Sequence, residues 1–236
     1  METKIFTIAL ALVCVAASVC MLYQGFKNSV YTVQEKRKKT LLISLSILAW
    51  VVYISVLTLT GFIQDWSSFP PKIFVLILLP AFVLIPFLIF SGRSDKLIRG
   101  IDGRFLIYIQ TFRVLVEILL WMMLKEGLIP IQMSFEGRNF DILVGLTAPI
   151  AGYLIYKNPL SINRPLQFGW NLFGLGFLIN IVSIAILSSP VPFRVFMNEP
   201  SNTMIADFPY VFIPAVFVVL ACTMHFMSLR KWYLER

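Results

Sequence analysis

Long apolar segments recur along the whole chain of 236 residues, and few charged residues interrupt them. Each segment approaches or exceeds the roughly 18 residues that a helix needs to cross about 30 Å of hydrocarbon. Only 14% of the residues are charged and mean hydropathy is +0.84, whereas a soluble domain has roughly 25% charged residues. The runs are continuous and do not alternate in polarity, which favours helices over a transmembrane barrel. We therefore expect an all-α, polytopic transmembrane helix bundle that forms a single domain over residues 1–236.

The apolar pattern predicts seven spans. They cover residues 4–23, 41–63, 73–92, 104–126, 139–156, 166–189 and 207–228. The first segment resembles a signal peptide, but the strongest basic block, EKRKK at 35–39, follows it. That order is typical of a retained helix whose amino terminus lies outside.

The distribution of basic residues supports this orientation. One side of the membrane would hold 14 of them, namely Lys27, Lys36, Arg37, Lys38, Lys39, Arg93, Lys96, Arg99, Arg104, Lys157, Arg164, Arg230, Lys231 and Arg236. The other side would hold 5, namely Lys4, Lys72, Lys125, Arg138 and Arg194. Because basic residues concentrate in cytoplasmic loops, we expect the amino terminus outside and the carboxyl terminus in the cytoplasm.

The fourth predicted span carries ionisable residues where a membrane helix rarely tolerates them. Gln110, Arg113, Glu117 and Trp121 follow helical spacing and so share one face. An ionised group at mid-bilayer costs about 2.5 to 3.5 kcal/mol on insertion scales, so this face should point into the bundle. Glu117 is the nearest acceptor for Arg113, although an acceptor on another helix is also open. The pair is either a buried structural ion pair that fixes helix rotation or part of a functional site.

The stretch FEGRNFDIL at 135–143 concentrates polar residues at the expected outer mouth of the bundle. Asn139 is a suitable helix cap, and Asp141 would lie in the first turn of the fifth span, where its charge complements the helix dipole. Capping does not explain Glu136 and Arg138. Together with Glu117 below them, these residues could form a polar pocket that opens outward.

Small residues on the fifth and sixth predicted spans indicate close helix packing. The stripes comprise Asp141, Gly145, Ala148 and Gly152 on the fifth span, and Gly169, Gly176, Asn180 and Ser183 on the sixth. Asn180 is embedded and could bond across the contact or contact a ligand.

His225 is the single histidine, and it lies near the predicted cytoplasmic end of the last span at a depth similar to that of Asn171. The two residues could form a proton or polar relay, or His225 could be an ordinary hydrogen-bonding residue near the interface. The cysteines lie inside apolar runs and are expected to pack as small residues; they are Cys14, Cys20 and Cys222. No spacing indicates a metal site or a disulfide framework.

Common catalytic and cofactor motifs do not occur in the sequence. It contains no Walker loop, HExxH, GxSxG or histidine-rich metal box, and the last predicted span has no lysine that could hold retinal. We therefore expect no cofactor and no metal. The net charge of +8 arises in loops, so it indicates membrane orientation and not a nucleic-acid partner.

Four strings carry a resemblance to a known family. They are FRVLVE at 112–117, FEGRNFDILVGLTAP at 135–149, WNLFGLGFLIN at 170–180 and HFMSLR at 225–230. The FRxxVE helix and the EGRNFDI loop are the most distinctive, and the match lies mainly in the second half of the chain. The sequence resembles a family of bacterial integral membrane proteins without an assigned activity. The resemblance implies a bacterial inner (cytoplasmic) membrane location and no mechanism.

Three functions fit these observations. The first is a transporter or sensor that binds a small polar or anionic molecule through an outward-facing pocket among the fourth to seventh spans, with Arg113 holding the ligand and Glu117 as a proton carrier or counter-ion. The second is a non-catalytic accessory or scaffold subunit, in a homo- or hetero-oligomer within the lipid bilayer. The third is a membrane enzyme that uses embedded carboxylates.

Overall fold

The computed structural model describes residues 1–158 and 161–236, and neither range contains a strand. The α-helices are α1 (Glu2–Asn28), α2 (Val33–Leu59), α3 (Leu79–Phe90), α4 (Asp95–Gly100), α5 (Gly103–Tyr108), α6 (Phe112–Lys125), α7 (Ile142–Tyr156), α8 (Arg164–Ser188) and α9 (Val219–Leu234). Three-residue 3-10 turns form η2 (Ile109–Thr111), η3 (Ile131–Met133) and η4 (Met204–Ala206). Two π-helical turns, η1 (Phe74–Leu78) and η5 (Ile213–Val218), lead directly into α3 and α9.

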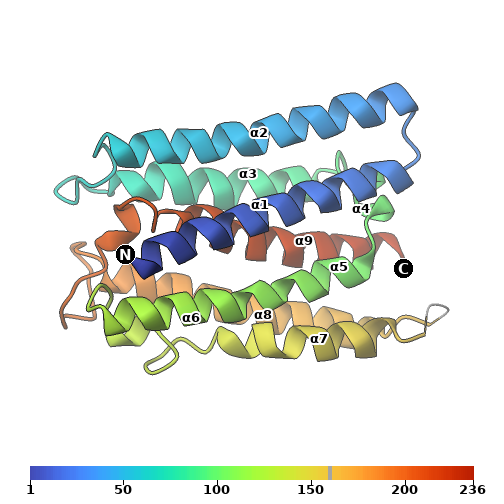
Figure 1. Ribbon diagram of the computed structural model, residues 1–236. Helices are drawn as coiled ribbons and strands as arrows, with labels where there is room; N and C mark the ends of the chain where they lie inside the picture. Colours follow the sequence, from blue (N-terminus) through green and yellow to red (C-terminus); the bar gives the residue numbers. More distant parts are fainter. Residues whose placement is uncertain (159–160) are drawn as a thin grey trace.

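The longer helices lie side by side along one common direction (Figure 1). In that view α2 and α3 form one side of the bundle, α7 and α8 lie on the opposite side, and α1 and α9 run between them. The amino terminus lies at one end of the bundle and the carboxyl terminus at the other. The α6, α7, α8 and α9 helices pack against one another in sequence order, since α6 contacts α7, α7 contacts α8 and α8 contacts α9.

Within the described part of the chain, five helices are long and apolar enough to cross a membrane. They are Glu2–Asn28, Val33–Leu59, Gly103–Lys125, Arg164–Ser188 and Ile213–Leu234. Two further apolar helices, Phe74–Phe90 and Ile142–Tyr156, are shorter. The 15 residues of α7 rise about 22 Å, less than the roughly 30 Å of a hydrocarbon core. The third and fifth predicted spans are therefore helical, but they do not meet the length of a complete span.

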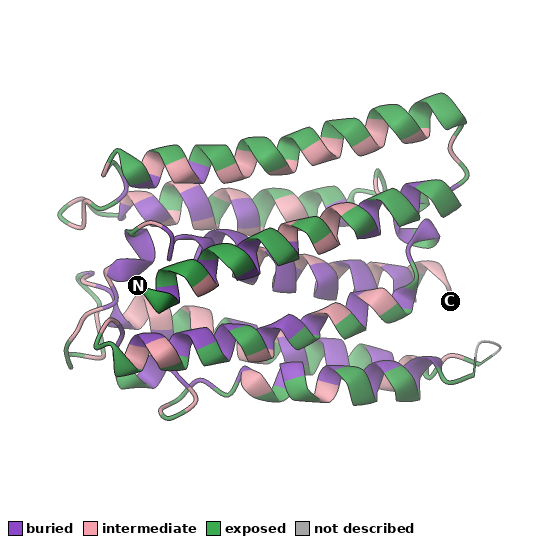
Figure 2. Cartoon of the chain, in the orientation of Figure 1, coloured by how far each residue is buried: buried purple, intermediate pink, exposed green. Residues whose placement is uncertain are grey.

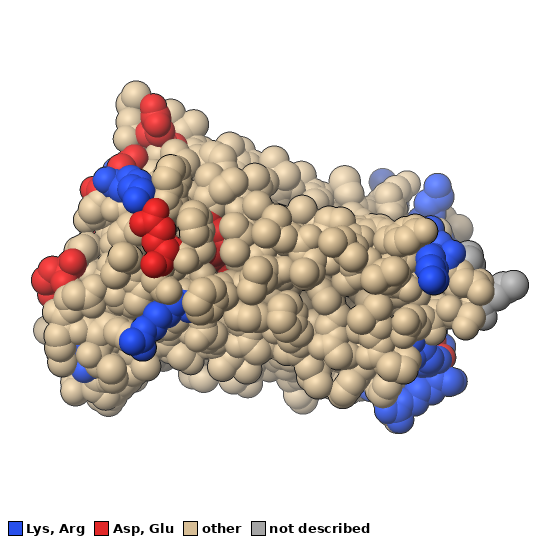
Figure 3. Space-filling model, turned by 90° about the horizontal axis from the view of Figure 1, so that it is seen from below, with Lys and Arg blue, Asp and Glu red and all other residues tan. Residues whose placement is uncertain are grey.

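Charged side chains gather at the two ends of the molecule (Figure 3). On the face shown, a broad uncharged band separates one end that is mostly blue with Lys and Arg from another end that carries both acidic and basic residues. A band without exposed charge is what a protein surrounded by hydrocarbon requires. Together with the five long apolar helices, it indicates a membrane protein.

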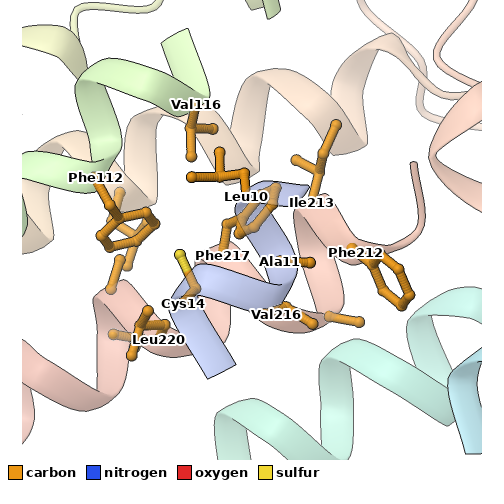
Figure 4. Close-up of a cluster of buried hydrophobic side chains, with 14 of the residues drawn as sticks. Leu10, Ala11, Cys14, Phe112, Val116, Phe212, Ile213, Val216, Phe217 and Leu220 are labelled. Carbon is orange, nitrogen blue, oxygen red and sulfur yellow. The ribbon is translucent and has the colours of Figure 1, made fainter. Parts of the chain in front are cut away.

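An apolar core joins α1 to the carboxyl-terminal part of the bundle (Figure 4). Residues of α1 pack against the start of α6 and against the helix formed by η5 and α9. The labelled core residues are Leu10, Ala11, Cys14, Phe112, Val116, Phe212, Ile213, Val216, Phe217 and Leu220. Cys14 and Cys222 are buried free thiols, as expected for packing residues, whereas Cys20 is exposed.

The fourth predicted span is not one regular helix. Its α-helical ladder is interrupted by η2, so that α5, η2 and α6 form a single rod with a tighter turn at its centre. Pro80 follows η1 and Pro214 lies within η5, and their missing N–H groups prevent a regular ladder of hydrogen bonds. Of these irregular turns, η2 directly precedes the start of α6, which carries Arg113.

A polar network at the centre of the helix bundle

Arg113 lies in the interior of the bundle with 1% of its surface exposed. Its Nε donates to Oδ2 of Asp141 at 2.6 Å, and its Nη2 bonds to Oδ1 of the same carboxylate. This two-pronged arrangement matches the fork of a guanidinium to the plane of a carboxylate. Nη1 reaches Nε2 of His225 at 3.0 Å, and both terminal nitrogens reach the carbonyl oxygen of Gly174 at 3.3–3.4 Å.

The partner of Arg113 differs from the nearest candidate in the sequence. Glu117 follows Arg113 by one helical turn, but the ion pair is made by Asp141, which lies just before α7. Arg before Glu is the weaker order for a pair on one helix. A carboxylate on a neighbouring segment can meet both guanidinium nitrogens, so the interhelical pair forms instead.

His225 and Asn171 extend the network from Arg113 into α8 and α9. Arginine can only donate, so Nε2 of His225 accepts and its Nδ1 carries the proton. Nδ1 then donates to Oδ1 of Asn171 at 2.9 Å. Both side chains are fully buried. We expected His225 near the cytoplasmic end of the last span; in the structure it lies near the middle of the continuous helix Ile213–Leu234 and contacts the central arginine.

Three residues outside the predicted site continue the chain of hydrogen bonds. Nδ2 of Asn171 donates to Oγ of Ser228 at 2.9 Å. Nε2 of Gln167 donates to the carbonyl oxygen of Ser228 at 3.3 Å and to the hydroxyl of Tyr156 at 3.1 Å. Helical spacing was a usable signal, because Gln167 lies four residues before Asn171 and Ser228 lies three residues after His225.

On the other side of Arg113, Asn139 joins the carboxyl group of Glu117 to the backbone of Asp141. Its Nδ2 donates to Oε1 of Glu117, and its Oδ1 accepts from the backbone N–H of Asp141 at 3.2 Å. Glu117 is 1% exposed and Asn139 is fully buried. Among the described residues, Oε2 of Glu117 is one of four buried side-chain polar atoms without a hydrogen-bond partner.

The start of α7 differs from the predicted cap. The helix begins at Ile142, and Asp141 is the residue before it. Asn139 lies outside the helix, and its side chain holds Asp141 and Glu117 instead of a first-turn N–H group. Asp141 is thereby aimed at Arg113 and makes no side-chain cap.

A glycine allows α8 to approach the network closely. A Cβ on Gly174 would overlap the ring of His225, so only glycine fits between α8 and α9 at this height. The indole of Trp170 packs against the same imidazole at a tilt, with ring centroids 5.3 Å apart and ring planes 46° apart. The histidine ring is therefore held by a hydrogen bond at each nitrogen and by contact with the indole.

The predicted small-residue stripes are correct for α7 and differ for α8. A Cβ on Gly145 would come within 2.7 Å of Val114, and one on Gly152 would overlap Tyr108, so the α7 stripe does face α5 and α6. On α8, Gly169 and Gly176 have open space around them, and the contact glycine is Gly174. Glycine at a helix contact and glycine facing outward look the same in a sequence.

Glu136 and Arg138 lie at the surface, apart from the buried carboxyl groups. Glu136 accepts from Nε1 of Trp121 at 2.7 Å and pairs with Lys125 at 2.8 Å, and these contacts hold its pKa below the ordinary value. The guanidinium of Arg138 lies 5.3 Å from the ring centroid of Phe196. Asn180 of α8 donates to the carbonyl oxygen of Arg138 at 3.0 Å. These residues form an exposed rim, which we define as Glu136, Arg138 and Asn180.

The buried residues form one connected set, called here the central network. It consists of Glu117, Asn139, Asp141, Arg113, His225, Asn171, Ser228, Gln167 and Tyr156. From Gln167 to Gly174 the helix rises about 10 Å, and from Arg113 to Glu117 about 6 Å. The network therefore extends over roughly half the thickness of a hydrocarbon core.

The composition of the central network bears on the chemistry it could perform. Within residues 1–158 and 161–236, no group of three or more His, Cys, Asp and Glu side chains could hold a metal ion. The network instead offers a guanidinium, two carboxyl groups, an imidazole, amides and hydroxyls. Such groups recognise anions and polar solutes, and they can exchange protons.

Comparison with known proteins identifies a family. No curated protein and no solved structure matches the chain. A family model described as a domain of unknown function (DUF8737) matches residues 70–233, which is well over half of the chain and includes the whole central network. The chain therefore belongs to the DUF8737 family.

Proposed function

We propose that this protein is a transporter or sensor of the membrane that binds a small polar or anionic molecule at the central network. The observation that supports the proposal is the position of Arg113, whose guanidinium is buried at the point where α6, α7, α8 and α9 meet. A buried cation in a membrane bundle is by default a candidate for substrate or ion recognition.

Every nitrogen of the Arg113 guanidinium has a partner, but the contacts are unequal, and a ligand could replace the weakest of them. Asp141 takes two N–H groups at short distance, whereas the carbonyl oxygen of Gly174 is reached only at 3.3–3.4 Å. A carboxylate or phosphate oxygen would bond to a guanidinium more strongly than a carbonyl at that distance. A ligand of this chemistry would replace the Gly174 contact and leave the ion pair with Asp141 in place.

We further propose seven spans, with the amino terminus outside and the carboxyl terminus in the cytoplasm of a bacterial inner membrane. The termini lie at opposite ends of the bundle, which is consistent with an odd number of crossings (Figure 1). Lys and Arg dominate the end that carries the carboxyl terminus on the face shown in Figure 3, in keeping with the positive-inside rule. In this orientation the exposed rim lies outside, where it would meet an incoming solute.

The proposal is tested by ligand-induced stabilisation in lipid nanodiscs. Thermal unfolding is measured with a panel of small carboxylates, inorganic phosphate and neutral polar solutes, for the natural protein, Arg113→Lys and the control Arg194→Lys. We expect an anion to stabilise the natural protein and the control by about 2.7 kcal/mol at 100 times its Kd. Arg113→Lys should lose this stabilisation because lysine lacks the planar fork. Absence of any stabilisation, or equal stabilisation of Arg113→Lys, would contradict the proposal.

A second candidate function is that of a non-catalytic accessory or scaffold subunit. The observation in its favour is α2, which has only Ile54 and Thr58 buried along its 27 residues and exposes apolar side chains over its length. A partner helix could cover this surface. Purification in mild detergent separates the two functions, because an accessory subunit should co-elute with a partner in constant ratio and show no anion-induced stabilisation.

A further inference from the structure

The central network contains two carboxyl groups but one permanent cation. Arg113 is the cation, and Asp141 and Glu117 are the carboxyl groups. His225 adds no charge, because its Nε2 accepts a hydrogen bond from Arg113 and its Nδ1 donates to Asn171. The remaining members are amides and hydroxyls, which are neutral. If both carboxyl groups were ionised, the interior would hold an uncompensated negative charge.

The geometry shows which carboxyl group the cation neutralises. Asp141 accepts two hydrogen bonds from the guanidinium. Glu117 receives one bond, from the neutral amide of Asn139, and its second oxygen is buried without a partner among the described residues. A buried carboxylate with one unpaired oxygen is strongly disfavoured, whereas a protonated carboxyl group is neutral.

Among residues 1–158 and 161–236, Arg113 is the one cation that acts on Glu117. The charged groups that act on it are Arg113 on its own helix and Asp141 before α7. From α9, His225 contacts Arg113. From α1, the apolar side chain of Leu10 lies beside Val116 (Figure 4). Arg113, already engaged by Asp141, would have to compensate both carboxylates if Glu117 were ionised.

We propose that the carboxyl group of Glu117 is a proton-binding site, and that the proton it holds is the coupling ion for movement of the solute. The coupling role rests on the proposed function, whereas proton binding is measured without any solute. When the proton leaves, Glu117 becomes a carboxylate one helical turn from Arg113 and competes with Asp141 for the guanidinium. Asn139, which bonds to the carboxyl group of Glu117 and to the backbone N–H of Asp141, transmits the change to the start of α7. Release of the proton therefore alters the contacts that Arg113 offers to a solute.

Infrared spectroscopy of the protein in lipid nanodiscs tests proton binding directly. At pH 7 the exposed carboxyl groups are ionised, so a C=O stretching band of a protonated acid reports a buried one. We expect this band in the natural protein and in the matched control Glu126→Gln, which removes an exposed carboxyl group at the end of the same helix. Glu117→Gln should lose the band. A band that persists in Glu117→Gln, or no band in the natural protein, would overturn the proposal.

Isotope labelling gives the same answer without a substitution, in case Glu117→Gln fails to fold. Protein labelled with ¹³C in the glutamate carboxyl groups should show the band shifted, and protein labelled in aspartate should not. A shift with aspartate labelling would instead assign the proton to Asp141 and contradict the proposal. Thermal unfolding with solutes in the same nanodiscs distinguishes proton binding from the proposed function. A Glu117 band without stabilisation by any solute would support the proton-binding site and refute the proposed function.

Discussion

The α2 helix and the helix formed by η5 and α9 differ in both composition and position. The former is the more hydrophobic of the two by mean hydropathy, yet it is the more exposed, with only Ile54 and Thr58 buried (Figure 2). The latter is less hydrophobic and is mostly buried, and it contributes His225 and Ser228 to the central network. In water the arrangement would be the reverse. Within a membrane, apolar side chains face lipid, and the residues that need partners are enclosed.

The range of the family model also excludes α2 and includes almost all of α9. It begins at residue 70, after α2, and ends at 233 within α9. Every member of the central network lies inside this range. The α2 helix is attached through few polar contacts, one of which is the bond from Nε1 of Trp50 to the carbonyl oxygen of Ala215 at 2.9 Å. The buried polar groups and the exposed apolar helix should therefore respond very differently to substitution.

The largest effect is expected for Asp141→Ala. It leaves Arg113 buried without its counter-ion, which should lower the free energy of unfolding by about 3–5 kcal/mol. The matched change on α2 is Leu48→Ala, at a side chain that is 58% exposed, and it should alter stability by less than about 0.5 kcal/mol. Unfolding in lipid nanodiscs measures both, and equal losses would remove the distinction between the two regions.

Gly174→Ala should have the next largest effect. The added methyl overlaps the ring of His225, and overpacking of this kind lowers stability by about 1–3 kcal/mol. Gly176→Ala is the control on the same helix, because open space surrounds Gly176. A loss in Gly176→Ala as large as that in Gly174→Ala would show that the close approach of α8 to α9 is not as described.

Trp50→Phe tests how α2 is attached. The ring remains, but the hydrogen bond to the carbonyl oxygen of Ala215 is lost, which should lower stability by about 0.5–1.5 kcal/mol. Hydrogen exchange should become faster in α2 and stay unchanged in α6 and α9. Uniformly faster exchange would indicate that α2 is part of the same cooperative unit as the central network.

The smallest effect concerns pH at the exposed rim. The contacts with Lys125 and Trp121 hold the pKa of Glu136 below its ordinary value. The stabilisation from these contacts is complete above the pKa of an unfolded glutamate, about 4.3, and is lost as pH falls through the lower folded value. Acid titration should thus change the fluorescence of Trp121, and the change should be absent in Glu136→Gln. The same titration curve for both proteins would contradict this assignment.

The sequence was sufficient for the helical class and for most members of the central network, because apolar runs and misplaced ionisable residues follow directly from the physics of a bilayer. It did not predict that Arg113 pairs with Asp141. Spacing along one helix identifies Glu117 as a partner, but it gives no information on which side chain of a neighbouring segment lies close to Arg113. Gly174 was missed for the same reason. The turn at η2 was missed because no proline or glycine marks it.

Contacts further along the central network also could not be predicted from spacing within one helix. Gln167 and Ser228 follow helical spacing from Asn171 and His225, but their meeting depends on how α8 and α9 are rotated about their axes. The predicted pocket at the outer mouth combined Glu117 with Glu136 and Arg138. In the structure, Glu117 is buried and Glu136 and Arg138 are exposed. The chain changes direction at Asn139, whose side chain is buried although Arg138 and Phe140 on either side of it are exposed.

Two double-mutant cycles test most directly whether the central network is organised around an interhelical ion pair. One cycle combines Arg113→Gln with Asp141→Asn, and the other combines Arg113→Gln with Glu117→Gln, with the free energy of unfolding in nanodiscs measured for every variant. We predict an interaction energy of about 2–3 kcal/mol for Arg113 with Asp141, at the upper end of values for contacting residues, and a clearly smaller one for Arg113 with Glu117. A larger interaction energy with Glu117 than with Asp141 would contradict the arrangement described here.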